Sequence, residues 1–87
     1  MRAIFHPDLQ KKYLKFNRKL QLQIEERIVL FIKDQNHPLL HNHALQGTYN
    51  GFSSINITGD YRAIYEVLAN DIVRFIDIDT HGKLYSK

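Results

Sequence analysis

A chain of 87 residues is long enough for one small domain with a single core, and its 44% hydrophobic and 11% aromatic residues exclude a disordered chain. The absence of cysteine excludes disulfide bonds and thiolate chemistry, and no apolar run reaches the roughly 20 residues that cross a bilayer. No targeting segment is visible in the first residues. We therefore expect one domain, residues 1–87, in a cytoplasmic protein with no membrane association.

The formal net charge of +3 is unevenly distributed. Residues 1–33 contain eight Lys or Arg against three Asp or Glu, a balance of +5, whereas residues 34–87 contain four against six, a balance of −2. The basic part can attract RNA or an acidic protein, and the same charges are equally typical of a solvated helix face. The candidate RNA-binding residues are Lys11, Lys12, Lys15, Arg18, Lys19 and Lys83.

The first half of the chain has the pattern of a strand and two helices. Residues 2–5, RAIF, predict a short strand, and Pro7 is typical of the first position of a helix because its missing N–H is harmless there. Apolar residues then recur at helical spacing in two stretches, 9–16 and 20–31, which are separated by Asn17. This pattern predicts two amphipathic helices that form a hairpin.

The second half has the pattern of a strand meander. Pro38 ends the second helix, because the residue before a proline is pushed out of the α region, and a loop is expected through about residue 51. Apolar and polar residues then alternate in three segments, 55–57, 61–67 and 72–78. Thr58-Gly59 and Ala69-Asn70 suit tight hairpin turns between them. The prediction is an α+β fold in the order β-α-α-β-β-β, with the helices on one face of the sheet.

Several polar side chains in the second half are of the types that act on a phosphodiester. They are His43, Asp60, Arg62 and His81, with Tyr85 behind them. Cleavage of RNA by its own 2′-hydroxyl requires a base, donors for the developing negative charge and an acid for the leaving 5′-oxygen, and it requires no metal. Histidine titrates near neutrality, and arginine offers a fork to phosphate oxygens. Asp60 and Arg62 are two apart on a predicted strand, which puts them on one face about 7 Å apart.

Each of these residues also has a purely structural interpretation. His81 can cap a turn with Thr80, and His43 can hold its loop in place. Arg62 and Asp60 can form a surface ion pair worth roughly 0–1 kcal/mol.

A metal site is a further interpretation of the loop histidines. His37, His41 and His43 lie in one loop, and an extended backbone would let His41 and His43 chelate a transition metal. The loop lacks cysteine and a helical His-x-x-x-His spacing. We expect no native metal and no cofactor.

Three motifs follow one another at defined spacing: H-x-L-x-G at 43–47, GDYR at 59–62, and TH with LY at 80–85. Together they resemble the RelE superfamily of toxin–antitoxin ribonucleases, and within it the YafQ-like branch, over nearly the whole chain. The resemblance implies a small toxin that enters the ribosomal A site and cuts messenger RNA. It also implies a cognate antitoxin as inhibitor, with operator DNA contacted only through the antitoxin complex.

The resemblance also implies roles for the candidate site residues. His43 and Asp60 resemble acid–base residues, and His81 resembles a C-terminal catalytic histidine that we assign as general acid. Either His43 or Asp60 is the base, and we favour His43 with Asp60 orienting it. Arg62 resembles an arginine that contacts the phosphate in the transition state, and Tyr85 resembles a terminal aromatic that positions RNA.

The chain departs from the YafQ-like pattern at three positions. Asn56 stands where a histidine is frequent, and Asp77 stands where a basic residue is frequent, with Asp79 beside it. Tyr61 stands where tryptophan is common. These departures leave two alternatives open: a ParE-like inhibitor of DNA gyrase, and a weak toxin homologue that acts by binding an antitoxin and repressing its operon.

Overall fold

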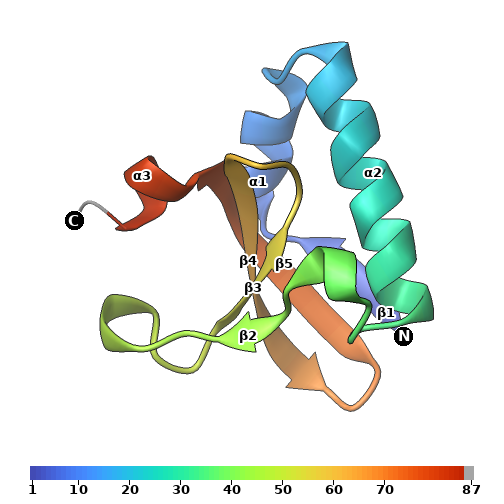
Figure 1. Ribbon diagram of the computed structural model, residues 1–87, viewed down its shortest axis with the longest axis vertical. Helices are drawn as coiled ribbons and strands as arrows, with labels where there is room; N and C mark the ends of the chain where they lie inside the picture. The colour runs from blue at the N-terminus through green and yellow to red at the C-terminus, as the bar shows by residue number, and fades with distance from the viewer. Residues whose placement is uncertain (86–87) are drawn as a thin grey trace.

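A mixed sheet with a helical hairpin on one face forms the body of the protein (Figure 1). The computed structural model describes residues 1–85. Its elements in chain order are β1 (Arg2–Phe5), α1 (Pro7–Leu14), α2 (Arg18–Lys33), η1 (Pro38–Leu40), β2 (His43–Ala44), η2 (Gly47–Tyr49), β3 (Ser53–Asn56), β4 (Tyr61–Ala69), β5 (Ile72–Thr80) and α3 (His81–Tyr85). The predicted α+β fold is confirmed, and the short elements η1, β2, η2 and α3 add to it.

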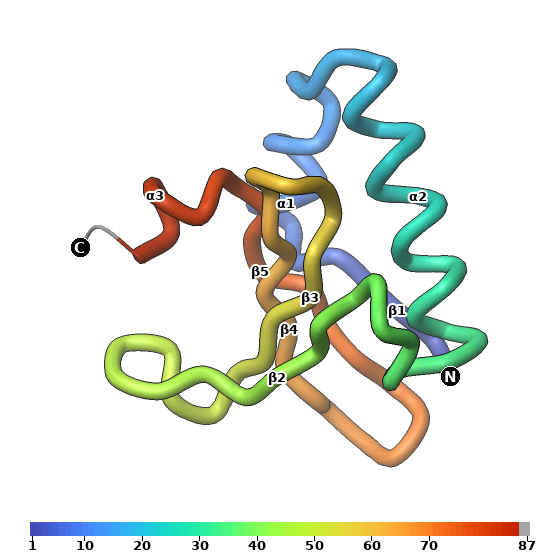
Figure 2. Tube along the Cα trace, in the orientation of Figure 1, coloured from blue at the N-terminus to red at the C-terminus, as the bar shows by residue number. Residues whose placement is uncertain are grey.

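The five strands lie in the order β1-β5-β4-β3-β2. Strands β2 to β5 pair antiparallel, which confirms the predicted meander, and β1 pairs parallel with β5. The chain trace in Figure 2 shows how the helical hairpin carries the chain away from β1 before the meander begins. The first strand thus joins the last one to complete the sheet, a pairing that local sequence patterns do not reveal.

Two side-chain caps explain why the helical region divides into two helices. The imidazole of His6 accepts a hydrogen bond from the Asp8 backbone N–H at 3.1 Å, with Pro7 at the first helical position of α1. The Asn17 side chain accepts from the Leu20 N–H at 2.9 Å and so begins α2. Each cap satisfies a backbone donor that the helix leaves unpaired.

The main core lies between the hairpin and the sheet, and aromatic rings form its centre. Phe31 of α2 is fully buried, and its ring lies 4.9 Å from that of Tyr65 and 5.8 Å from that of Phe75. Both contacts are edge-on, the favourable arrangement for aromatic quadrupoles. These contacts hold α2 against β4 and β5.

The opposite face of the sheet carries α3 and the segment that contains η2 (Figure 1). The predicted placement of the helical hairpin on one face is confirmed, and α3, which the sequence did not predict, lies on the other face. This helix has five residues and one buried side chain, Leu84. A helix so short has no apolar period that a sequence pattern can reveal. No helix within residues 1–85 is long and apolar enough to cross a membrane.

Candidate active site

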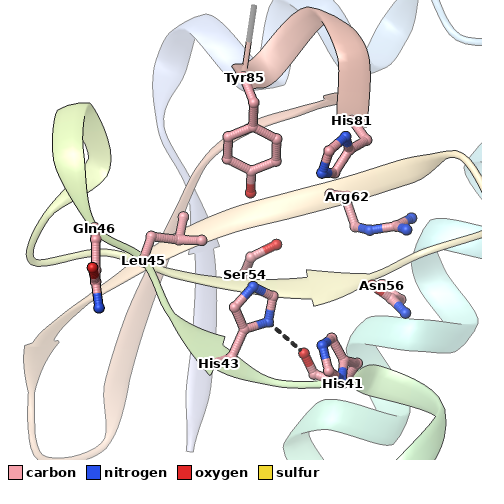
Figure 3. Close-up of a pocket in the computed structure, with 9 residues that line it drawn as sticks. All are labelled: His41, His43, Leu45, Gln46, Ser54, Asn56, Arg62, His81 and Tyr85. Carbon is pink, nitrogen blue, oxygen red and sulfur yellow. Dashed lines mark hydrogen bonds between the residues drawn. The ribbon is translucent and has the colours of Figure 1, made fainter.

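A pocket of about 440 Å³ lies on the sheet face that the hairpin leaves free (Figure 3). Each of β2, β3, β4 and α3 contributes polar or aromatic side chains to its lining. Those side chains are His43 from β2, Ser54 and Asn56 from β3, Arg62 from β4, and His81 and Tyr85 from α3. In Figure 3, Tyr85 and His81 project from α3 toward the strands, and the His43 ring faces them from β2.

Four of the five residues proposed from the sequence therefore line one pocket, and Asp60 does not. Asp60 lies just before β4 and lines a separate depression with Lys19 and Tyr61. The Thr58 hydroxyl accepts hydrogen bonds from the N–H groups of Asp60 and Tyr61, at 3.2 and 3.0 Å. This turn keeps Asp60 out of the strand, so the expected shared strand face with Arg62 is wrong.

The imidazole of His43 is held in one tautomer by the backbone. Its Nδ1 lies 2.8 Å from the carbonyl oxygen of His41, and a carbonyl can only accept, so Nδ1 carries the proton. Nε2 of the neutral ring then has a free lone pair. His41 itself adopts left-handed backbone angles, φ 45° and ψ 49°, at the end of η1. That conformation aims its carbonyl at His43.

Arg62 is anchored by the turn that precedes its own strand. Its Nη1 donates to the carbonyl oxygens of Thr58, Gly59 and Tyr61 at 2.9, 3.1 and 3.1 Å. Nε and Nη2 make no hydrogen bond with any residue in 1–85, so these donors remain available. A planar guanidinium held in this way presents a fixed fork to an oxyanion.

The start of α3 places His81 beside Tyr85. The His81 backbone N–H donates to the Asp60 carbonyl at 2.9 Å, and the Thr80 hydroxyl accepts from the Lys83 N–H at 3.3 Å. The structural alternative for His81, a turn cap, therefore applies to Thr80 and to the backbone. The His81 ring instead packs on Tyr85, with ring centroids 4.7 Å apart.

Tyr85 also contacts Tyr49, with which it lines a smaller neighbouring pocket. Its ring lies edge-on to Tyr49 of η2, with centroids 5.9 Å apart. The pKa of Tyr49 lies above its ordinary value because of burial first, and then because of the nearby Asp77 and Tyr85. Tyr49 therefore stays a neutral phenol, and the aromatic contact joins the η2 segment to α3.

Two further polar groups at the pocket were not proposed from the sequence as part of the site chemistry. Ser54 is fully buried, and neither its Oγ nor the Oδ1 of Asn56 has a hydrogen-bond partner within residues 1–85. Ser54 is the strand partner of His43, and Asn56 is the strand partner of Arg62. An amide cannot exchange a proton near neutral pH, so Asn56 offers no acid or base at this position.

Asp77 and Asp79 share one lysine that reaches them from the other side of the sheet. Nζ of Lys12 in α1 lies 2.7 Å from Asp77 Oδ1 and 2.8 Å from Asp79 Oδ2. Burial alone lowers the pKa of Lys12, but the bonds to both carboxylates outweigh it, and the pKa stands above its ordinary value. Burial raises the pKa of Asp79, but the bonds from Lys12 and the Thr80 N–H outweigh it, and the pKa is lowered.

The remaining candidate RNA-binding residues lie apart from the pocket. Lys11 belongs to α1, Lys15 caps its C-terminus, and Arg18 and Lys19 belong to α2, on the hairpin side of the sheet (Figure 1). Only Lys83 lies on an element that lines the pocket, the helix α3.

The loop histidines do not gather around a common point. Nδ1 of His37 accepts from the Leu39 N–H at 3.1 Å and caps η1, whereas the His41 and His43 rings contact each other at a tilt of 48°, with centroids 4.8 Å apart. Within residues 1–85, no group of three or more metal-binding side chains is placed to hold an ion.

The fold is similar to that of solved YafQ and YoeB toxin structures. No protein-family model matches the chain, and no curated protein matches it in sequence. Among solved structures, YafQ from Escherichia coli BL21(DE3) superposes with a TM-score of 0.76 at 18% identity, over 97% of both chains. The YoeB/ParE toxin from Agrobacterium tumefaciens also gives 0.76, at 19% identity over 93% of this chain and 99% of that one.

A third structure contains such a toxin with its partner. The DinJ–YafQ complex of Escherichia coli superposes with a TM-score of 0.73 at 19% identity, over 97% of both chains. The resemblance recognised from the three sequence motifs is thus confirmed for the fold.

Proposed function

We propose that this protein is the toxin of a type II toxin–antitoxin system and acts as a ribosome-dependent messenger RNA endoribonuclease. The observation that carries the proposal is the meeting of two histidines and an anchored arginine in one pocket. The sequence separates His43 from His81 by an entire strand meander, yet the fold brings both to the same cavity. Two histidines and an arginine in this arrangement suit phosphoryl transfer without a metal.

We propose the following role for each group in this reaction. Nε2 of His43 removes the proton from the 2′-hydroxyl, because Nδ1 is committed to the His41 carbonyl. The 2′-oxygen attacks phosphorus, and the bond from phosphorus to the 5′-oxygen breaks as His81 donates a proton to that oxygen. The products are a 2′,3′-cyclic phosphate and a 5′-hydroxyl. Arg62 binds the phosphorane oxygens through Nε and Nη2.

Tyr85 keeps the role expected from the sequence, whereas Asp60 does not act as the base. Tyr85 positions a base by stacking, a contact that tolerates any base. Asp60 contributes through its backbone carbonyl, which accepts from the His81 N–H, rather than as the base. The orienting partner of His43 is the His41 carbonyl, in place of Asp60.

An antitoxin is the partner that we propose for this chain. The superposed YafQ and YoeB structures include complexes named with DinJ and YefM. The basic hairpin, with its balance of +5 over residues 1–33, suits an acidic polypeptide. Operator DNA would be contacted only through that complex.

The decisive experiment is translation in vitro of a defined messenger with the purified protein, followed by primer extension to map new 5′ ends. We expect cuts at fixed codon positions that require ribosomes and disappear with His81→Ala. The matched control is His37→Asn, which replaces another loop histidine outside the pocket and keeps a side chain suited to cap η1. The control should cut like the wild type.

Intact messenger with the wild-type protein would overturn the nuclease proposal. A supercoiling assay with purified DNA gyrase then tests the ParE-like alternative, and repression of a promoter by the toxin–antitoxin complex tests the third. A growth defect that persists in His81→Ala would likewise favour target binding over RNA cleavage.

A further inference from the structure

Arg62 and Asp79 lie directly opposite each other in neighbouring strands, yet their side chains turn apart. The two residues are Cα partners in the β4–β5 ladder, so their side chains start on the same face with Cβ atoms about 4.5–5.5 Å apart. Opposite charges at such positions normally attract. No Arg62–Asp79 ion pair forms within the part of the chain that the structure describes. Hydrogen bonds to other partners therefore hold the Arg62 guanidinium and the Asp79 carboxylate apart.

On one side, the turn before β4 draws Arg62 away from β5. All three hydrogen bonds of its guanidinium with described residues use Nη1, and all go to backbone carbonyls of residues 58–61. These carbonyls lie toward the β3 side of the strand, since the turn links β3 to β4. They leave two edges of the guanidinium open for a carboxylate or a phosphate.

On the other side, Lys12 draws Asp79 away from β4. Asp79 Oδ2 accepts from Lys12 Nζ at 2.8 Å, and its Oδ1 accepts from the Thr80 N–H at 2.8 Å. The same ammonium binds Asp77 at 2.7 Å. Strand β1 pairs only with residues 72–75 of β5, so the edge at 77–79 is open for Lys12 to approach from α1.

Asp79 remains a charged competitor for Arg62 at physiological pH. The bonds from Lys12 and the Thr80 N–H keep the pKa of Asp79 below its ordinary value, despite burial that acts in the opposite direction. An ionised carboxylate beside the phosphate subsite would pair with the guanidinium and repel an incoming phosphate. Asp77 adds a second negative charge on the same strand.

We propose that Lys12 is a positioning residue of the pocket: it binds Asp77 and Asp79 and so keeps Asp79 off the Arg62 guanidinium, which stays open to a phosphate group. This inference rests on the proposed function only in taking the ligand to be an RNA phosphate. From its place in the basic hairpin, Lys12 was expected to bind RNA directly. The role proposed here is a different one. Without Lys12, the two carboxylates beside Arg62 lose the ammonium that binds both of them.

Inorganic phosphate is the probe for the first test, with the Arg62 Nε–H resonance in a ¹⁵N NMR titration as the readout. We expect K12M to weaken phosphate binding by roughly tenfold, because Asp79 then occupies the guanidinium. K12M/D77N/D79N should regain the wild-type affinity, and K12R should retain it. The matched control K33M loses an equal charge from an exposed position of the neighbouring helix α2 and should bind like the wild type.

Two results would overturn the inference. Wild-type phosphate affinity in K12M would show that Asp79 does not compete for Arg62. A K12M/D77N/D79N protein as weak as K12M would show that Lys12 contacts the anion itself. Circular dichroism checks that each variant folds, and K12Q removes the same charge if K12M does not fold.

RNA cleavage separates this inference from the proposed function. If the wild type cleaves RNA, kcat should fall in K12M and return in K12M/D77N/D79N, a rescue that a general loss of stability would not produce. If the wild type cleaves no RNA while the phosphate titrations behave as expected, the role of Lys12 stands and the nuclease proposal fails. If K12M cleaves RNA at the wild-type rate, the role of Lys12 fails and the nuclease proposal stands.

Discussion

The imidazole of His43 donates its Nδ1–H to the backbone carbonyl of His41 across 2.8 Å, and the two rings contact each other at a tilt of 48°, with centroids 4.8 Å apart. The backbone oxygen of His41, two residues before His43, thus decides which nitrogen of the His43 ring faces the pocket. A backbone carbonyl can only accept, so it fixes the neutral ring in the tautomer that carries its proton on Nδ1.

We therefore expect His43→Gln to lose cleavage by a factor of about 10²–10⁴, the usual contribution of a general base. Glutamine retains hydrogen bonding and approximate size but cannot take a proton. The measurement is the single-turnover rate on programmed ribosomes. A His43→Gln rate within threefold of the wild type would remove His43 from the chemistry.

His41→Gly separates the backbone role of His41 from any role of its ring. The left-handed φ of 45° suits glycine, which offsets the extra freedom that glycine gives the unfolded chain. We expect the free energy of unfolding, measured in urea, to stay within about 1 kcal/mol of the wild type. Cleavage should persist, because the carbonyl remains. A large loss of cleavage in a stable His41→Gly protein would show that the His41 ring, which also lines the pocket, takes part in the reaction.

Arg62→Lys tests the anchored fork. Lysine keeps the charge but cannot bond three carbonyls and a phosphate with one planar group, so we expect cleavage to fall by about 10²–10³. The control is Arg74→Lys, since Arg74 pairs with Glu66 at 2.7 Å and does not line the pocket. Equal losses in both variants would point to a general effect of arginine on the sheet.

The Lys12–Asp79 pair predicts a stability profile with two limbs. Asp79 has a lowered pKa, so its stabilisation is present above 3.8 and is lost as pH falls through the folded value. Lys12 has a raised pKa, so its stabilisation is present below 10.5 and is lost as pH rises through the folded value. Between these limits, we expect Asp79→Asn to lower the free energy of unfolding by roughly 1 kcal/mol or less, since the lysine is partly exposed and screened.

Urea unfolding of Asp79→Asn and the wild type across this pH range makes the comparison. Asp71→Asn, which removes an exposed carboxylate in the β4–β5 turn, serves as the control. The difference between Asp79→Asn and the wild type should shrink below pH 3.8. A difference independent of pH would show that the amide alters packing rather than charge.

Phe31→Ala tests the core that supports the pocket from beneath the sheet. Its ring is fully buried against Tyr65 and Phe75, so we expect a loss of about 3–5 kcal/mol in the free energy of unfolding. That is a large share of the stability of a small domain. Leu14→Ala, at a side chain 77% exposed, should change it by about 0.5 kcal/mol at most. A loss below about 1 kcal/mol in Phe31→Ala would contradict the packing described.

Local patterns in the sequence were sufficient for the long elements. The period of apolar residues predicted α1 and α2, and alternation with turn residues predicted β3, β4 and β5, because these signals depend on neighbours a few residues apart. The same patterns failed for β2 and α3. Two and five residues are too few to show a period, and both elements exist because they pack on the meander.

Residue type and the family resemblance predicted the chemistry of the candidate site, but they did not predict every residue that lines it. His43, Arg62, His81 and Tyr85 were proposed and do line the pocket, whereas Asp60 was proposed and does not. Arg62 lines the pocket and Asp60 does not, because β4 begins at Tyr61, between the two residues. Thr58 binds the Asp60 N–H in a turn, so the alternation that places Arg62 on the pocket face begins one residue too late for Asp60.

The amino-acid sequence by itself determined the kinds of elements, the chemical types of the site residues and the class of fold, because all three follow from local periodicity and motif spacing. Only the tertiary structure decided which groups meet. Lys12 reaches Asp77 across 65 positions of sequence, and β1 lies beside β5, because pairing and packing between distant segments, rather than neighbouring residues, bring them together.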